Sequence, residues 1–167
     1  RMRRMCIRGR QAVACQEKAR QSAAQLAVQF EELADSGLQT AIWGGTGKAA
    51  AFINQHQLDM QRFPTVIDSD MNKVGTFVPG TGQEIHFRDW LLDHPVDVIL
   101  IATQWLAAHI VLQIQRNLLP CKSLLLAFPV QPIIYSHYNH PYRRSEPSAI
   151  SHLPRLLPLS QKQRYRY

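Results

Sequence analysis

The sequence lacks the features that mark a membrane protein, a secreted protein or a metalloprotein. No apolar run in its 167 residues reaches the roughly 18 residues of a membrane span, and the basic first twenty residues contain no apolar signal segment. Cys6, Cys15 and Cys121 form no C-x-x-C pair, and the spaced pair His137 and His140 has no carboxylate or thiolate beside it. We therefore expect a cytoplasmic protein without a membrane contact, a disulfide framework or a bound metal.

Basic residues are scarce in the middle of the chain, although the whole sequence has a net charge of +7. Residues 1–20 carry a charge of +6 and residues 131–167 carry +5, whereas residues 21–130 carry −4. A nucleic-acid-binding domain places its lysines and arginines on the folded face that contacts phosphates. We interpret the basic ends as solvated tails and expect no specific nucleic-acid partner.

Apolar runs alternate with helical periodicity along residues 11–128. The pattern predicts helices at 11–36, 48–56, 87–94 and 105–118, and strands at 39–43, 64–68, 97–102 and 123–128. The run at 97–102 is continuous rather than alternating, which is typical of a parallel strand covered on both faces. The alternation of strands and helices predicts an α/β fold, a half-Rossmann three-layer sandwich with about four parallel strands.

The composition divides the chain into three parts. Residues 1–36 form a basic N-terminal segment and helix, and residues 37–130 form the Rossmann-like domain. Residues 131–167 contain five prolines, six basic residues and no sustained periodicity, so we expect an irregular basic tail there.

A glycine-rich turn follows the first predicted strand. Residues 44–50 read G-G-T-G-K-A-A, so that Gly45, Gly47 and Ala50 match the G-x-G-x-x-G/A turn of dinucleotide-binding folds. Asp68 ends the second predicted strand 18 residues after Ala50, where an acid would accept hydrogen bonds from a ribose. The turn therefore indicates a nucleotide site, or glycines that the strand–helix turn requires for its own geometry.

A second unusual segment joins the second strand to the predicted helix at 87–94. It contains K-x-G at Lys73 and F-V-P-G-T-G at 77–82, in which Pro79 and Gly80 form a turn pair and Thr81 and Gly82 expose further backbone amides. One interpretation is a ligand-binding loop over the carboxyl ends of the strands. The other is a structured connection that packs Phe77 on the edge of the sheet.

Acid–base chemistry has few candidates in this sequence. Asp68, Asp70, Glu84 and His86 could gather at the strand ends, and a histidine–carboxylate pair is the minimum for a general base. We interpret His86 as a surface histidine and Cys121 as buried packing. No catalytic residue is identified from the sequence.

Three stretches resemble the C-terminal domain of SAM-dependent sugar C-methyltransferases. They are I-W-G-G-T-G-K at 42–48, V-I-D-x-x-x-x-K-x-G-T-F-V-P-G-T-G-x-E-I at 66–85, and D-V-I-L-I-A at 97–102 with the helix of Trp105 after it. The resemblance covers about residues 25–130, and the K-x-G-x-x-x-P-G-T pattern is its most specific part. It identifies the Rossmann-like part of this chain with that C-terminal domain.

The resemblance also implies a role. In complete enzymes of the family, a cysteine-rich zinc-binding head and a SAM-binding catalytic domain precede this domain, which packs on the catalytic domain and helps to enclose a nucleotide-linked sugar. The candidate ligand-binding residues are those of the two loops and of the strand end between them: Gly44, Gly45, Thr46, Gly47, Lys48, Asp68, Lys73, Pro79, Gly80, Thr81 and Gly82.

Several parts of the family pattern are missing. The sequence has no zinc cysteines, no second glycine loop for SAM and no counterpart of the catalytic Tyr/His segment, and it has Ala108 and His109 where relatives often carry an acidic pair. We therefore expect that the chain alone neither transfers methyl groups nor binds a cofactor, SAM belonging to the complete enzyme. The implied partner is a methyltransferase catalytic domain, in cis or in trans, and the start at Arg1 leaves open whether the chain is a fragment or stands alone.

Two alternatives of other classes remain open. The glycine turn and Asp68 fit a stand-alone NAD(P)- or nucleotide-binding Rossmann module. A scaffold domain whose loops bind only protein is the third interpretation.

Overall fold

The computed structural model describes residues 17, 20–21, 23–128 and 131–134. Residues 23–35 lie in an N-terminal helix, to which residues 17, 20 and 21 also belong. The remaining elements are, in chain order, β1 (Thr40–Trp43), α2 (Lys48–Gln55), β2 (Thr65–Asp68), β3 (Ile85–Phe87), the 3₁₀ helix η1 (Arg88–Leu92), β4 (Val98–Ile101), the 3₁₀ helix η2 (Gln104–Leu106), α3 (Ala107–Arg116), β5 (Ser123–Phe128) and β6 (Gln131–Ile134).

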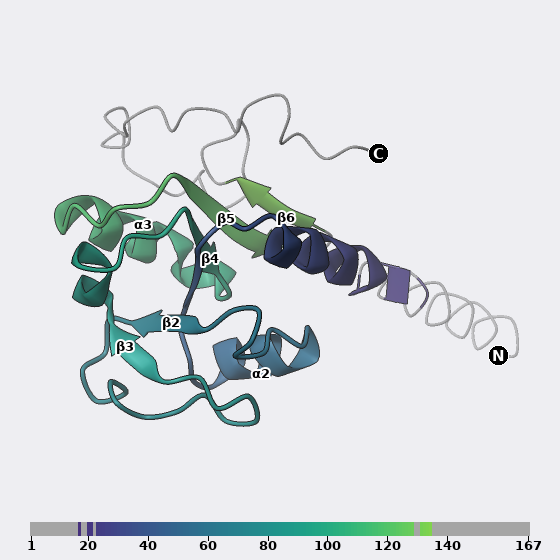
Figure 1. The fold of residues 1–167 in the computed structure, drawn as a ribbon, viewed down its shortest axis with the longest axis horizontal. Coiled ribbons are helices and arrows are strands. Elements are labelled where there is room, and N and C mark those ends of the chain that lie inside the picture. Colours follow the sequence, from purple (N-terminus) through teal and green to yellow (C-terminus); the bar gives the residue numbers. More distant parts are fainter. Residues whose placement is uncertain (1–16, 18–19, 22, 129–130, 135–167) are drawn as a thin grey trace, which may run out of the picture.

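All six strands belong to one sheet, in the order β3-β2-β1-β4-β5-β6. The first five are parallel, and β6 pairs antiparallel with β5. This is the strand order of a complete doubly wound α/β sheet. The order reverses between β1 and β4, so the connections leaving these two strands go to opposite faces of the sheet (Figure 1). The predicted α/β class and Rossmann-like architecture are confirmed.

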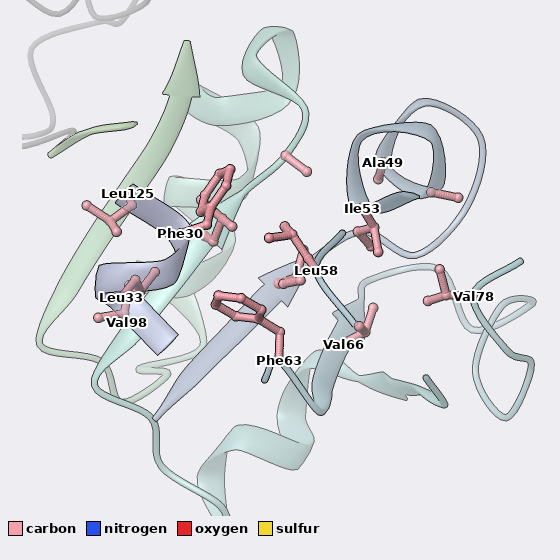
Figure 2. Packing of buried hydrophobic residues seen from close by; sticks show 14 of the residues in the cluster. Phe30, Leu33, Ala49, Ile53, Leu58, Phe63, Val66, Val78, Val98 and Leu125 are labelled. Atoms are coloured by element: carbon pink, nitrogen blue, oxygen red, sulfur yellow. The ribbon is translucent and has the colours of Figure 1, made fainter. Parts of the chain in front are cut away.

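Two hydrophobic clusters cover the two faces of the sheet. On one face the N-terminal helix and α2 pack against alternate strand residues, with Phe30, Ile53 and Val66 among them (Figure 2). On the other face α3 and η1 pack against the intervening residues, with Ile110, Leu91 and Ile99 among them. Because β1 and β4 are buried along their whole length, they require the continuous apolar runs seen in the sequence.

The sequence missed two strands, each for a physical reason. The β3 strand has only three residues and a polar centre at His86, so it carries no apolar run. The β6 strand contains Pro132 and lies at the edge of the sheet, where a missing backbone N–H is tolerated. Residues 131–134, which the composition placed in the tail, therefore extend the sheet. The helix predicted at 87–94 is present as the short 3₁₀ helix η1, directly after β3 ends at Phe87.

Residues 1–16 and 135–167, with most of the predicted basic tails and the pair His137 and His140, lie outside the described residues. The domain boundaries after residues 36 and 130 stay predictions. Within the described part of the chain, none of the helices has the length and apolar character to cross a membrane.

Candidate functional site

The glycine turn occupies the point where the strand order of the sheet reverses. The N–H of Gly44 donates to the carbonyl of Ile67 on β2 over 2.7 Å, which ties the end of β1 to its neighbour. Gly44 and Gly47 have φ values of 100° and 57°, a region that favours glycine, and Gly47 leads directly into α2. Open α/β sheets bind ligands in the crevice at this position.

Gly45 is required by packing. A Cβ on Gly45 would collide with the side chain of Ile85 and lie 3.1 Å from Cγ1 of Val66, both in the fully buried core. A Cβ on Gly44 would lie 3.0 Å from that of Ala49. The structure thus gives these glycines a structural reason, the second of the two interpretations that the sequence left open. The ligand role of the turn stays a prediction.

Asp68, at the end of β2, is buried and already engaged within the chain. Its side chain accepts a hydrogen bond from the N–H of Asp70 at Oδ1 (3.0 Å) and pairs with Nζ of Lys73 at Oδ2 (3.2 Å). The same ammonium lies 3.7 Å from Oδ2 of Asp70, whose pKa is lowered first by a hydrogen bond from the N–H of Asn72. Lys73 of the K-x-G motif therefore pairs with both strand-end acids and holds the start of the following loop against β2.

The P-G-T-G loop packs against α2 rather than against the glycine turn. The Asn54 side chain donates to the carbonyl of Pro79 over 2.7 Å, and a Cβ on Gly80 would collide with Asn54. Buried Gln83 donates to the carbonyls of Leu58 and Phe63 over 2.7 and 2.9 Å. Both carbonyls belong to the segment that joins α2 to β2.

Two further contacts of the P-G-T-G loop hold it in place. Val78 is buried in the same cluster as Ile53 (Figure 2), and the hydroxyl of Thr81 donates to the side-chain oxygen of Gln83. Pro79, Gly80 and Gly82 are exposed on its outer side. The contacts join the loop to the C-terminal half of α2, whereas Gly44–Lys48 precede and begin that helix.

An aromatic residue that the site prediction did not include lies against the glycine turn. The ammonium of Lys48 is 4.3 Å from the ring centre of Trp105, which follows β4 in η2. Trp105 is 52% exposed and its neighbour Leu106 is 45% exposed. The available signal was the position of a tryptophan four residues after a buried strand, at the carboxyl edge of a parallel sheet.

The acid–base candidates do not form one cluster. His86 stacks on Trp90 with ring centres 4.7 Å apart, and Trp90 stacks on His94 at 3.8 Å. An isolated antiparallel β-bridge pairs the backbones of Glu84 and Phe77. The side chain of Phe77 is exposed rather than packed on the sheet. Among the residues that the structure describes, no group of three histidine, cysteine or carboxylate side chains could hold a metal ion.

Cys121 is partly buried against the cluster of α3, and this burial raises the pKa of its thiol to about 11. A thiol with such a pKa remains protonated near neutral pH and is a poor nucleophile. The interpretation of Cys121 as packing agrees with this environment.

The chain matches a protein family over most of its length and is similar to several solved structures. No curated protein matches the sequence. A solved structure titled UDP-D-quinovosamine 4-dehydrogenase from Vibrio fischeri is 15% identical, with a TM-score of 0.37 over 55% of this chain and 78% of the other. Residues 11–129 match the family described as the C-methyltransferase C-terminal domain. Together with the confirmed Rossmann-like sheet, this match shows that the chain belongs to the C-methyltransferase C-terminal domain family.

Proposed function

We propose that this chain is the substrate-side accessory domain of a SAM-dependent C-methyltransferase that acts on a nucleotide-linked sugar. It supplies no SAM site of its own and works beside a catalytic domain, in cis or in trans. The supporting observation is that the one glycine turn of the family pattern lies at the reversal point of the sheet, next to an exposed lysine and an exposed tryptophan.

The charge of this domain argues against a nucleic-acid partner, and its cysteine content fits a cytoplasmic location. Its folded middle part carries a charge of −4, so it offers no broad basic face to nucleic acid. The absence of cysteine pairs in the sequence suits a reducing compartment. The catalytic groups for methyl transfer would then come from the partner domain.

A domain replacement tests this proposal. The full chain is fused in place of the C-terminal domain of a SAM-dependent sugar C-methyltransferase, and transfer of labelled methyl groups from SAM to the nucleotide-linked sugar is measured. We expect transfer above that of the truncated enzyme and none by this chain alone. The control fuses an unrelated Rossmann-like domain of similar size. A fusion that folds and binds SAM yet transfers no faster than this control contradicts the proposal.

A second candidate is a stand-alone NAD(P)-binding module, favoured by the glycine turn beside a strand that ends in an acid. Both oxygens of Asp68 already accept a hydrogen bond or ion pair inside the chain, so a ribose would have to share or displace these partners. This candidate predicts NAD binding that Asp68→Ala weakens at least tenfold. NAD affinity that is absent, or unchanged in Asp68→Ala, contradicts it.

A further inference from the structure

The contact between Lys48 and Trp105 joins the two connections that diverge from the reversal point. Lys48 begins α2, which covers one face of the sheet, and Trp105 lies just before α3, which covers the other. Their side chains nevertheless meet, with the ammonium 4.3 Å from the ring centre. The pair therefore spans the carboxyl edge of the sheet between β1 and β4, where ligands of open α/β sheets lie.

Neither side chain is needed for the core. Trp105 has 52% of its surface exposed, and Lys48 is also exposed and belongs to no ion pair within the described part of the chain. A cation–π contact at an exposed site is weak, so a ligand that offers the ammonium an anion can replace it. Removal of the ammonium uncovers a flat aromatic face beside a mobile positive charge.

Thr103 gives the same edge a third polar group. It follows β4, is 9% exposed, and its hydroxyl donates to no acceptor among the described residues. Its oxygen is not among the fully buried polar atoms that lack a partner, so water or a ligand oxygen can reach it. The edge thus combines a stacking surface and a cation, and the hydroxyl of Thr103 lies two residues before the tryptophan in the chain.

We propose that Lys48 and Trp105 form a subsite for the nucleoside diphosphate part of a ligand. Trp105 stacks on the base, and Lys48 leaves the indole ring to bind the diphosphate. The identification of the ligand as a nucleotide-linked sugar rests on the proposed function, whereas the pairing of a planar ring with an anion comes from these two side chains. Stacking on an indole tolerates any base, so Trp105 contributes affinity rather than choice of base.

Isothermal titration of the full chain tests the subsite, with UDP, dTDP, ADP and GDP as probes and with uridine and inorganic pyrophosphate as their separate parts. We expect nucleoside diphosphates to bind more tightly than either part. Lys48→Ala should weaken the binding of UDP at least tenfold and leave the affinity for uridine nearly unchanged, while Lys48→Arg retains most of the affinity for UDP. Trp105→Ala should weaken both UDP and uridine about tenfold, and Trp105→Phe should restore most of the loss.

Matched controls use residues outside the edge. Arg116→Ala removes an exposed positive charge at the end of α3, and Trp90→Phe changes a tryptophan stacked between two histidines; neither should alter UDP affinity. The subsite is overturned if no nucleoside diphosphate binds, or if Lys48→Ala and Trp105→Ala bind UDP as the unchanged chain does. Methyl transfer by the fusion together with either of these results would leave the proposed function standing. UDP binding that responds to both variants, without methyl transfer by the fusion, would refute the proposed function alone.

Discussion

At the scale of single residues, close contacts explain why this sequence uses glycine and glutamine where it does. Gly45 lies against Ile85, and Gly80 lies against Asn54, so both positions exclude a Cβ. Gln83 is fully buried, yet its amide donates to two carbonyls that no strand partner reaches. These residues belong to the motifs that indicated a ligand site, and each also has a structural task.

Gly45→Ala should lower the free energy of unfolding by about 1–3 kcal/mol, because the new methyl group would collide with Ile85 in a filled core. Urea denaturation measures the change. In an Ile85→Ala background the loss should shrink by about 1 kcal/mol, since the colliding atoms are gone. Gly47→Ala is the control, because its Cβ would meet nothing and its cost should be equal in both backgrounds. Equal costs of Gly45→Ala in both backgrounds would contradict the packing explanation.

Gln83→Ala should destabilise the protein by about 2–4 kcal/mol, because it leaves the carbonyls of Leu58 and Phe63 buried without a donor. Chemical denaturation measures the change against Gln61→Ala, an exposed position that should shift stability by less than about 0.5 kcal/mol. A similar, small effect of both variants would show that Gln83 does not anchor the loop.

Asp97, which lies at the amino edge of the sheet, makes the stability of the protein depend on pH. The hydrogen bond from Lys122 first, and then the N–H of Gln39, lowers the pKa of this carboxyl below its usual value of 3.8. The folded state therefore holds the charged form more strongly than the unfolded state does. The resulting stabilisation is complete above about pH 5 and is lost as the pH falls through the lowered pKa.

Asp97→Asn should accordingly cost about 1–2 kcal/mol at pH 7 and much less at pH 2–3. Urea midpoints of the two proteins across this range measure the difference. Lys122→Gln removes the main cause and should move the pKa of Asp97 upward toward its usual range. A penalty for Asp97→Asn that is constant from pH 2 to pH 7 would contradict this assignment.

At the scale of elements, the sequence predicted what depends on long apolar patterns and missed what depends on pairing. The strands at 39–43, 64–68, 97–102 and 123–128 are confirmed within one or two residues, because buried parallel strands require continuous apolar runs. The β3 and β6 strands exist only because β2 and β5 offer free edges, which no local pattern reveals. Likewise the approach of Trp105 to Lys48 follows from strand order, which the sequence alone did not provide.

The packing of the N-terminal helix against the sheet should contribute to the stability of the protein through its buried side chains. Phe30 is 2% exposed, and its ring packs edge-on against those of Phe52 and Phe63. The ring centres are 5.8 and 6.4 Å apart. Phe30→Ala should cost about 3–5 kcal/mol, because it leaves a large cavity among aromatic side chains. The change is measured by thermal or urea unfolding beside Val28→Ala, whose side chain is mostly exposed. Comparable losses from both variants would mean that the helix does not belong to the core.

At the scale of the whole molecule, the described sheet has the strand order of a complete doubly wound α/β fold, and the order reverses at the edge formed by the carboxyl ends of β1 and β4. That edge carries the glycine turn, Lys48 and Trp105, whereas the P-G-T-G loop packs toward the C-terminal half of α2. The two loops of the family pattern thus divide their tasks in our proposal: the first faces the ligand, and the second stabilises the helix that carries Lys48.

Thermal unfolding of the full chain in the presence of candidate ligands tests the central claim most directly. A ligand that binds only the folded state at a hundredfold excess over its Kd adds about 2.7 kcal/mol of stability, which is several degrees in Tm for a domain of this size. We predict that UDP-glucose or dTDP-glucose raises Tm, that NAD and NADP, which share only the nucleoside diphosphate part, raise it less, and that SAM does not raise it. A Tm that no sugar nucleotide changes, or that SAM or a dinucleotide raises instead, would contradict the account.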